Sequence, residues 1–453
     1  MSTELNMIKG LYNMFEQSPF ICTDTRKIIP NALFFCLKGE NFDGNLFVNE
    51  ALEKGAAYVI TEKNSMQGSD MEYPLQFLKG CPKGGVVNIE ERIIVVDNVL
   101  QTLQQLAHFH RKQLKIPVIG ITGTNGKTTT KELIASVLSK KYKTAFTQGN
   151  FNNHIGVPLT LLSIKNEDEI AVIEMGANHP GEIEKLCQIA QPDIGLITNI
   201  GKAHLEGFGS IENIIETKTA LYRSAPILFI NNEDKILIQK AVLRQCSATE
   251  KKKIIYYGND TEISGQIIEM NPYLVINLFN KKIQTQLTGN YNFSNILAAA
   301  AIGKYFGISQ QDICDAIAEY APQNNRSQII KNKTHTIIAD YYNANPTSVK
   351  AALDNFLQIE APHKLAIVGD MLELGENSAS EHQAVIDFCE ENDITSVFIG
   401  EIFYSLKNNR FLFFKNVAEL NHYINSLPSF AAQKLILIKG SRGVHLENIS
   451  LFR

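Results

Sequence analysis

The amino-acid sequence predicts a multidomain α/β protein built on parallel sheets. The chain has 453 residues, which exceeds one ordinary hydrophobic core and favours two or three domains. Short apolar runs alternate with helical patterns along most of the chain, as in doubly wound sheets. A glycine-rich turn joins one of these runs to a helical pattern, and this turn is the strongest local signal in the sequence.

Composition limits the class of protein and its partners. Hydrophobic residues make up 44% of the chain and charged residues 20%, which is typical of a globular protein. The net charge of −4 disfavours a nucleic-acid partner, which requires a basic surface. The sequence has neither an apolar run long enough to span a membrane nor the apolar core of a signal peptide. Seven scattered cysteines without a Cys-x-x-Cys pair favour a reducing compartment, so we expect a cytoplasmic protein. The sequence does not indicate an oligomeric state, and a monomer is the default expectation.

We expect the first domain, residues 1–112, to be a small α/β unit. Its apolar runs predict short strands at 32–39, 56–60 and 92–97. Residues 98–113 have helical spacing, and the following Lys-Ile-Pro ends the helix.

The central domain, residues 113–321, is predicted to contain a doubly wound parallel sheet. Its continuous apolar runs predict buried strands at 117–123, 170–176, 194–200 and 226–232. Between 262 and 288 the apolar residues alternate instead, which predicts an antiparallel patch. Residues 295–308 predict a helix that ends at a glycine.

We expect the C-terminal domain, residues 322–453, to be a Rossmann-like α/β unit. Further buried strands are predicted there at 334–340, 364–370, 396–400 and 434–441, with helices between them. Ligands of such sheets gather at the carboxyl ends of the strands, so residues that follow these runs are candidates for a site.

The stretch "VIGITGTNGKTTTKELIASVL", residues 118–138, predicts a phosphate-binding loop. Backbone N–H groups of the turn and the start of the helix favour an anion. Lys127 would reach the β- and γ-phosphates and Thr128 would supply a hydroxyl to Mg²⁺. Gly123 precedes Gly126 by three residues, so the loop is shorter than the general pattern. The alternative is an ordinary turn between a strand and a helix.

Two further residues are candidate metal ligands. Glu174 interrupts the apolar run 170–176, at the carboxyl end of a predicted strand, and a carboxylate there suits Mg²⁺. Its alternative role is a capping or solvated glutamate. His204 follows the run 194–200, although a lone histidine is more often structural.

Eight motifs occur in one order along nearly the whole chain, and together they resemble the Mur ligases, which build the peptide of bacterial peptidoglycan. The motifs are "GITGTNGKTTT" (120–130), "TQGNFNNHIGVPLTLL" (147–162), "IEMGANHPGEIEKL" (173–186), "ITNIGKAHLEGFGS" (197–210), "GNYNFSNILAAAA" (289–301), "NRSQII" (325–330), "DYYNANPTS" (340–348) and "KGSRGVHLE" (439–447).

Two regions resemble particular members of this family. "TDTRKI" (23–28) and residues 34–60 resemble the uridine-nucleotide module of the two later ligases, and the Gly-x-Gly-x-x-Gly of the earlier ones is absent. "DYYNANPTS" resembles the signature of the last ligase, and the Asp-Asn-Pro-Arg of the preceding one is absent. The resemblance implies an enzyme that uses ATP to join D-alanyl-D-alanine to UDP-N-acetylmuramoyl-tripeptide through an acyl phosphate.

The resemblance also implies the catalytic, metal and ATP-binding residues. It assigns catalysis to Lys127, Glu174, His204 and Lys218, and two Mg²⁺ ions to Thr128, Glu174, His204 and a carbamylated Lys218. The family pattern has a glutamate two residues after this lysine, where this chain has Ala220, and without the resemblance Lys218 is a solvated helix residue. The implied ATP-binding residues are Gly123, Thr124, Asn125, Gly126, Lys127, Thr128, Thr129, Asn292, Asn295, Arg326 and Asp340. Helix capping by Asn292 and a surface ion pair of Arg326 are the alternatives.

The implied substrate residues lie in three places. Asp24, Thr25 and Arg26 resemble the uridine-nucleotide motif, and Lys38, Asp43 and Gly44 belong to the same region. The sugar or peptide would face Asn150, Asn152 and Asn153, although asparagines are also common in turns. The D-alanyl-D-alanine site would be lined by Asn343, Ala344, Asn345 and Pro346, with "KGSRGVHLE" near the same cleft.

Three other classes of protein are alternatives on the sequence: another ligase of the same superfamily, a P-loop switch or ATPase, and a non-catalytic relative. A folylpolyglutamate synthetase or the preceding tripeptide ligase would share the phosphate loop, but the uridine module disfavours the first and "DYYNANP" the second. A P-loop switch or regulatory ATPase would need motifs of its own class. A non-catalytic relative is disfavoured by the presence of Lys127, Thr128, Glu174 and His204 together.

Overall fold

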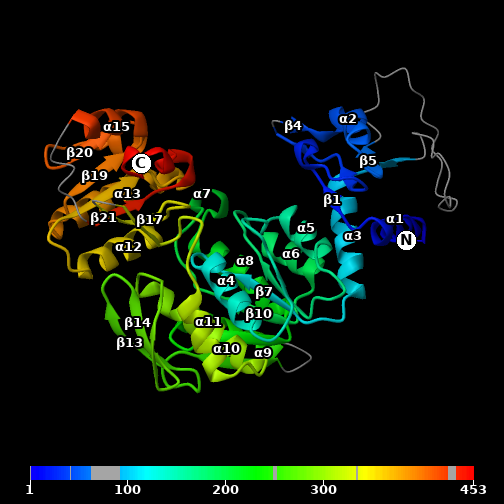
Figure 1. Cartoon of the computed structure of the whole chain (residues 1–453), viewed down its shortest axis with the longest axis horizontal. Coiled ribbons are helices and arrows are strands. Elements are labelled where there is room, and N and C mark those ends of the chain that lie inside the picture. Colours follow the sequence, from blue (N-terminus) through cyan, green and yellow to red (C-terminus); the bar gives the residue numbers. More distant parts are fainter. Residues whose placement is uncertain are drawn as a thin grey trace. The chain divides into compact units, whose positions relative to one another are not determined.

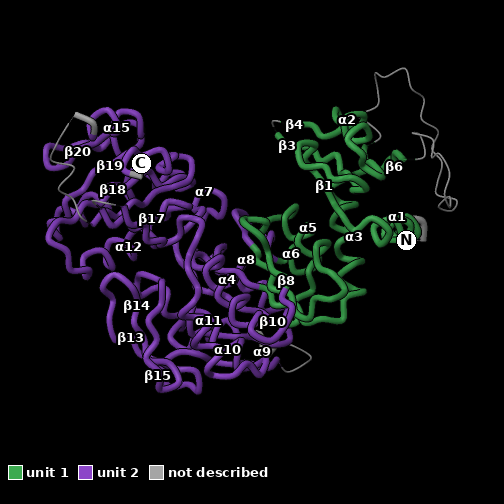
Figure 2. Tube along the Cα trace, in the orientation of Figure 1, with its two compact units in different colours: residues 1–120, 145–175, 184–193 green, residues 121–144, 176–183, 194–453 purple. Residues whose placement is uncertain are grey.

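The structure is a computed structural model that describes residues 2–40, 42–62, 92–247, 252–332, 335–426 and 435–452. Cys81 lies outside the described residues. The chain divides into two compact units (Figure 2), and each is described by itself. The first comprises residues 1–120, 145–175 and 184–193, and the second residues 121–144, 176–183 and 194–453.

The first unit contains a parallel sheet with the strand order β1-β2-β5-β6, which confirms the small α/β unit expected from the sequence. Its elements are α1 (Ser2–Gln17), β1 (Ile21–Cys22), β2 (Leu33–Phe35), α2 (Val48–Glu53), β5 (Tyr58–Glu62), β6 (Ile93–Val96) and α3 (Val99–Gln113), with a hairpin of β3 (Lys38–Gly39) and β4 (Phe42–Asp43). Helix α3 begins where the sequence predicts, because the side chain of Asn98 accepts a hydrogen bond from the Gln101 N–H at 2.7 Å.

The central sheet has six strands in the order β12-β11-β10-β7-β9-β8. They are β7 (Val118–Thr122), β8 (Thr144–Phe146), β9 (Ile170–Glu174), β10 (Ile194–Ile197), β11 (Ile227–Asn231) and β12 (Lys253–Tyr257). The four predicted strands of this sheet are confirmed. Strands β8 and β12 were not predicted from the sequence, and most of their residues are half-buried.

Helices follow most of these strands, and an antiparallel patch precedes α10 (Figure 1). The helices are α4 (Lys127–Leu138), α5 (Gly156–Leu162), α6 (Glu182–Ala190), α7 (Leu205–Phe208), α8 (Ile211–Ser224), α9 (Lys235–Ser247), α10 (Tyr291–Tyr305) and α11 (Gln310–Glu319). The expected antiparallel patch consists of β13 (Gly265–Met270), β14 (Leu274–Leu278) and β15 (Lys281–Gln284).

The bounds predicted for α10 were wrong by a few residues. The helix begins at Tyr291 rather than at 295, because its first turn includes polar residues that carry no apolar periodicity. It ends at Tyr305 rather than at 308, and Gly307 follows with a φ of +69°, as expected for a glycine stop.

The C-terminal part of the second unit has a six-stranded sheet with the order β16-β17-β21-β18-β19-β20. Its strands are β16 (Gln328–Lys331), β17 (Thr336–Asp340), β18 (Lys364–Gly369), β19 (Ser396–Ile399), β20 (Leu412–Phe414) and β21 (Leu435–Lys439), and its helices are α12 (Pro346–Gln358), α13 (Ser378–Glu391), α14 (Glu401–Ser405) and α15 (Val417–Ser426). Only β16 is antiparallel to its neighbour, and separate apolar clusters include alternate residues of these strands, as in a doubly wound sheet. Below, residues 322–452 are called the C-terminal lobe, and the rest of the second unit is called the central lobe.

Within the part of the chain that the structure describes, none of the helices combines the length and the apolar character that a bilayer crossing requires.

Candidate active site

Two positions in the turn between β7 and α4 accept only glycine. Gly123 has a φ of +146°, and a Cβ there would lie 1.9 Å from the Thr198 hydroxyl oxygen. Gly126 has a φ of +78°, and its Cβ would lie 2.8 Å from Asn295 Oδ1. A side chain at either position would clash with these neighbours. Glycine therefore allows the close backbone packing that a phosphate-binding loop requires.

Hydrogen bonds and burial hold the residues of this loop in place. The Lys127 ammonium donates to the carbonyls of Gly123 at 2.8 Å and Thr124 at 3.0 Å. Thr128 and Thr129 are buried in the first turn of α4. The lysine is therefore directed back over the loop, where a phosphate group would replace the carbonyl oxygens as its partner.

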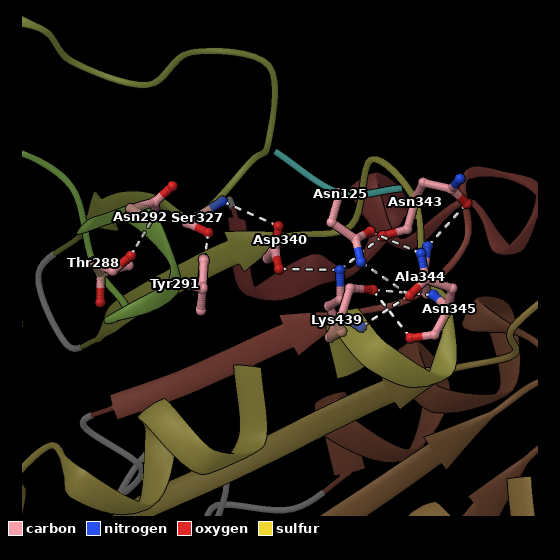
Figure 3. Close-up of polar contacts among 11 residues, drawn as sticks. Asn125, Thr288, Tyr291, Asn292, Ser327, Asp340, Asn343, Ala344, Asn345 and Lys439 are labelled. Atoms are coloured by element: carbon pink, nitrogen blue, oxygen red, sulfur yellow. Dashed lines mark hydrogen bonds and ion pairs between the residues drawn. The ribbon is translucent and has the colours of Figure 1, made fainter. Parts of the chain in front are cut away.

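Asn125 connects the loop to the C-terminal lobe (Figure 3). Its backbone N–H donates to Asn199 Oδ1 at 3.0 Å, and the Thr198 hydroxyl donates to its carbonyl at 2.6 Å. Its side chain exchanges hydrogen bonds with that of Asn345, with Asn345 Nδ2 donating to Asn125 Oδ1 at 2.8 Å. The loop expected to hold ATP thus contacts the loop expected to hold the amine substrate.

Asn292 and Asn295 form a buried amide chain between α10 and α4. Asn292 Nδ2 donates to the Thr288 carbonyl at 2.8 Å, and Asn295 Nδ2 donates to Asn292 Oδ1 at 2.9 Å. The Thr130 hydroxyl donates to Asn295 Oδ1 at 3.0 Å. Helix capping by Asn292 was a wrong alternative, because the N-cap residue is Asn290 and Asn292 lies within the first turn.

Glu174 is a buried carboxylate at the carboxyl end of β9. Its side chain is 1% exposed, so the alternative of a solvated glutamate was wrong. Oε1 accepts a hydrogen bond from Asn152 Nδ2 at 2.8 Å, and the Glu174 N–H donates to the Thr147 hydroxyl at 3.0 Å. A buried carboxylate is costly unless it binds a cation or hydrogen-bond donors, which suits a metal ligand.

The three asparagines after β8 have different surroundings. Asn152 contacts Glu174, whereas Asn153 Oδ1 accepts from the backbone N–H groups of Ile155 at 3.1 Å and Gly156 at 2.9 Å. The turn alternative therefore holds for Asn153. Asn150 is exposed in a turn, where its carbonyl accepts from the Asn152 N–H at 2.7 Å.

His204 follows β10 and contacts the C-terminal lobe. It has a φ of +51° and is the N-cap residue of α7. Its Nδ1 forms a short contact with Glu373 Oε2, and hydrogen bonding to His204 lowers the pKa of the Glu373 carboxyl. The sequence analysis did not identify Glu373. The sequence feature that could have identified Glu373 is the acidic stretch "GDMLELGE" (369–376), which begins at the end of a buried strand.

Lys218 is buried within α8, so its alternative as a solvated lysine was wrong. It is 3% exposed, and its ammonium lies 5.7 Å from the centroid of the Phe208 ring. Burial, and next the charge of Lys127, lower the pKa of Lys218 well below the usual value of lysine. A lowered pKa raises the fraction of the neutral amine, which is the nucleophilic form of lysine.

The half-buried Asp340 and the buried Lys439 form an ion pair where β17 and β21 end side by side (Figure 3). The Lys439 ammonium lies 3.0 Å from Asp340 Oδ2 and donates to the Asn343 carbonyl at 2.7 Å. Asp340 Oδ1 accepts from the Ser327 N–H at 3.1 Å. The "KGSRGVHLE" motif therefore supports the candidate amine-site loop through its first residue.

The next residues of that loop begin α12. The Ala344 N–H donates to Asn343 Oδ1 at 2.9 Å, and Pro346 occupies the first helical turn. Asn345 caps the helix, because its Oδ1 accepts from the Ser348 N–H at 2.9 Å and the Ser348 hydroxyl accepts from the Asn345 N–H at 3.1 Å. This capping box fixes the side chain of Asn345 in the direction that reaches the central lobe.

Arg326 stacks on an aromatic ring at the start of the C-terminal lobe. Its guanidinium carbon lies 3.8 Å from the centroid of the Tyr342 ring, and that of Arg442 lies 5.8 Å from the same centroid. Within the described ranges, Arg326 Nε is buried without a hydrogen-bond acceptor and Arg326 has no ion pair. The alternative of a surface ion pair is therefore not supported, and the group remains available to an anion.

An ion pair between Asp24 and Arg26 stabilises the first part of the candidate uridine motif. Both oxygens of Asp24 accept from the Arg26 guanidinium at 2.8 Å. This hydrogen bonding lowers the pKa of Asp24 to about 2. Arg26 is nevertheless 85% exposed, and the carbonyl of Thr25 accepts from Lys54 at 3.2 Å.

The second half of this motif is the β3–β4 hairpin and the turn after it. Lys38 and Asp43 form an ion pair at 3.2 Å, and Asp43 Oδ1 accepts from the Asn45 N–H at 3.0 Å. A Cβ on Gly44 would lie 2.6 Å from the Leu37 carbonyl oxygen, so the backbone there packs too closely for another residue. These contacts place the six candidate uridine residues within the first unit.

The residues present fit a nucleotide and Mg²⁺. No described group of three His, Cys, Asp or Glu side chains forms a preorganised metal cage. Mg²⁺ does not need one, because it commonly takes one or two carboxylates and fills its other positions with phosphate oxygens and water. Taken one by one, the buried hydroxyl of Thr128 and the buried carboxylate of Glu174 are donors of the kind that Mg²⁺ takes, and the glycine backbone of the loop suits a phosphate.

Comparison with known families covers most of the chain. Residues 18–111 match the profile described as the Mur ligase family catalytic domain. Residues 121–303 match the Mur ligase middle domain. Residues 325–442 match the profile described as Mur ligase, glutamate ligase domain.

Individual relatives are similar over nearly their full length. The UDP-N-acetylmuramoyl-tripeptide–D-alanyl-D-alanine ligase of Bacillus subtilis is 35% identical, over 98% of this chain and 95% of that protein. That of Rickettsia prowazekii is 34% identical, over 92% and 91%. The crystal structure of MurF from Acinetobacter baumannii superposes with a TM-score of 0.82 at 30% identity, over 94% of this chain and 91% of that one.

Proposed function

The chain belongs to the Mur ligase family, and from this membership we propose that it uses ATP to join D-alanyl-D-alanine to UDP-N-acetylmuramoyl-tripeptide. The product would be the pentapeptide precursor of peptidoglycan. Relatives of at least 34% identity that carry this ligase name support the substrates. The structural observation that carries the proposal is the contact between Asn125 and Asn345, because it brings the phosphate loop to the candidate amine site.

The proposed reaction has two steps. A carboxylate oxygen of the tripeptide attacks the γ-phosphorus of ATP, a new P–O bond forms, and the bond to the β-phosphate breaks to release ADP. The amine of D-alanyl-D-alanine then attacks the acyl carbon, the C–N bond forms, and inorganic phosphate leaves with loss of the amine proton. Because anions meet in the first step, positioning and charge stabilisation dominate catalysis.

Residues of the phosphate loop would bind ATP and screen its charge. Lys127 would exchange its loop carbonyls for phosphate oxygens, and Thr128 and Glu174 would hold one Mg²⁺. A second Mg²⁺ would be held by His204. Bound Mg²⁺ would stabilise the negative charge of the transferring phosphate. The other proposed ATP contacts are from Gly123, Thr124, Asn125, Gly126, Thr129, Asn292, Asn295, Arg326 and Asp340.

Lys218 is proposed to carry a carbamate. Its neutral amine would attack CO₂, forming an N–C bond and releasing a proton, and the anion would complete the second Mg²⁺ site. The lowered pKa of Lys218 supports this step, because a protonated amine cannot attack CO₂. The carbamate would also replace a buried cation with a group that a metal ion neutralises.

The proposed substrate sites lie on both units. UDP would bind the first unit through Asp24, Thr25, Arg26, Lys38, Asp43 and Gly44. The sugar or peptide would contact Asn150, Asn152 and Asn153, and D-alanyl-D-alanine would contact Asn343, Ala344, Asn345 and Pro346. We further propose a cytoplasmic monomer with a substrate domain (1–112), an ATP-binding domain (113–321) and a ligase domain (322–453).

The test is phosphate release with ATP, Mg²⁺, UDP-N-acetylmuramoyl-tripeptide and D-alanyl-D-alanine, with each component left out in turn. The expected result is release that needs all four, together with a pentapeptide product of the correct mass. Release that needs the tripeptide nucleotide but is indifferent to D-alanyl-D-alanine would refute the amine substrate. No release with any combination would refute the ligase activity.

A further inference from the structure

Glu373 of the C-terminal lobe contacts His204 of the central lobe. Oε2 of Glu373 meets Nδ1 of His204, while 22% of the histidine side chain and 54% of the glutamate side chain remain exposed. The two residues are 169 positions apart in the sequence, so the contact depends on how the lobes of the second unit pack. The two lobes are thus joined at the histidine that the proposed function assigns to Mg²⁺.

The contact determines which imidazole nitrogen can bind a cation. A carboxylate beside Nδ1 favours the tautomer with a proton on that nitrogen, because the N–H then donates to the carboxylate. Nε2 then keeps its lone pair and is the available ligand atom. Metal-binding histidines commonly have such a carboxylate partner, which orients the ring and raises its basicity.

The Glu373 backbone contacts the segment that follows His204. The Glu206 N–H donates to the Glu373 carbonyl at 3.4 Å. Gly375, two residues after Glu373, has a φ of +56°, and a Cβ there would be in ordinary van der Waals contact with Glu206. Glu373 itself has a φ of +64°, so its loop adopts an uncommon conformation that aims the carboxylate at His204.

We propose that Glu373 is a positioning residue that orients His204 to bind the second Mg²⁺ through Nε2. The C-terminal lobe would then contribute to this metal site by orienting a ligand of the central lobe. This inference rests on the proposed function, since His204 is assigned to Mg²⁺ there. It assigns a role to the "GDMLELGE" stretch, which the sequence motifs left without one.

The first test is Mn²⁺ binding, measured by electron paramagnetic resonance in the presence of a non-hydrolysable ATP analogue. Glu373→Ala is expected to weaken one of two bound ions by about 10- to 100-fold and to leave the other unchanged. Glu373→Gln is expected to retain part of the affinity, because its amide oxygen still accepts from Nδ1–H. Equal or tighter binding of both ions by Glu373→Ala would overturn the proposal.

A neighbouring ion pair provides the matched control. Lys202 and Glu381 also join the two lobes, at 2.8 Å, without contacting His204. Glu381→Gln removes this contact and should leave both Mn²⁺ affinities within about twofold of the wild type. If Glu381→Gln weakened the same ion as much as Glu373→Ala, lobe packing would explain the effect and the positioning role would be refuted.

The tautomer of His204 gives a readout that needs no metal. Nitrogen-15 spectra of the labelled enzyme, with His204→Asn to assign the signals, should show a protonated Nδ1 and a bare Nε2 in the wild type. Glu373→Ala should shift the ring toward the other tautomer, and a wild-type ring protonated on Nε2 would overturn the proposal. Failure of the proposed function would be seen separately, as wild-type enzyme that forms no pentapeptide.

Discussion

Asn125 and Asn345 form a reciprocal amide pair, with hydrogen bonds of 2.8 and 3.4 Å, between the phosphate loop and the first turn of α12 (Figure 3). Asn345 has a second role in the same position, because its Oδ1 caps α12. One side chain thus stabilises a helix and joins two lobes, and the two effects can be separated by substitution.

Asn345→Ala is expected to lower the free energy of unfolding by about 0.5–2 kcal/mol, because the helix loses its cap. Asn345→Ser keeps a capping hydroxyl but cannot reach Asn125, so its unfolding in urea should remain close to that of the wild type. Both variants should lower kcat/KM for D-alanyl-D-alanine by about 2- to 10-fold, from the loss of one or two hydrogen bonds. Wild-type kcat/KM in Asn345→Ser would contradict a functional role for the pair.

Gly126→Ala is expected to lower the affinity for an ATP analogue by at least about tenfold, because the new Cβ must displace the buried Asn295 amide. Gly181→Ala is a matched control, since its φ of +80° is nearly the +78° of Gly126 but nothing lies within 4 Å of its Cβ. Calorimetric titration of both variants would separate backbone strain from steric conflict. Equal losses of affinity would mean that the close packing of Gly126 is unimportant.

Lys218→Met should slow ligation strongly and raise the melting temperature in CO₂-free buffer. An apolar side chain of similar length removes the cost of burying an amine, which the lowered pKa of Lys218 reflects. The loss of turnover should be on the order of 10²- to 10³-fold, as for other groups that stabilise developing charge. Enzyme in carbon-13 bicarbonate should give a carbamate signal that is missing from Lys218→Met, and full activity of that variant would refute the carbamate.

Removing one of the two charges of the ion pair between Asp340 and Lys439 should lower the free energy of unfolding of the second unit. Asp340→Asn should cost about 3–5 kcal/mol, because it leaves the buried ammonium of Lys439 without its charged partner, whereas Lys439→Met should cost less, because Asp340 is only half-buried. The double variant should be less destabilised than the sum of the two, as measured by denaturant unfolding. Additive losses would show that the two side chains do not stabilise each other.

The stability of the first unit should fall as the pH falls from about 7 to 5, in part through His110. Burial lowers the pKa of this histidine, which contacts the Tyr12 hydroxyl at 3.1 Å and the Ile164 carbonyl at 3.3 Å. Below the ordinary histidine pKa of about 6.5 the unfolded chain binds a proton that the folded chain does not, so acid favours unfolding.

The variant His110→Gln should therefore have a smaller slope of unfolding free energy against pH in this window. The slope of the wild type under the same conditions is the reference. Urea unfolding at several pH values would measure both slopes. An unchanged slope in His110→Gln would mean that this histidine is not the titrating group.

Much of the site was predictable because its signals are local. A strand, a short glycine turn and a helix follow one another at residues 118–138, and the positive φ values of Gly123 and Gly126 explain why glycine occupies both positions. Glu174 was predictable for a similar reason, since a carboxylate that ends an apolar run lies at the carboxyl end of a buried strand.

Other features were decided by tertiary structure, because they depend on residues that are distant in the sequence. Helical spacing could not distinguish a solvated Lys218 from one buried beside Phe208. Likewise, the pairing of Asp340 with Lys439 required β17 and β21 to be neighbours, which strand order in the sequence does not indicate.

The sequence by itself therefore determined the alternation of strands and helices, the phosphate loop and the family resemblance, all of which rest on residues close together or in a fixed order. Only the tertiary structure decided that Glu373 meets His204 and that Asn345 meets Asn125. The physical reason is that a contact between lobes depends on how whole sheets and helices pack, and no local spacing encodes that arrangement.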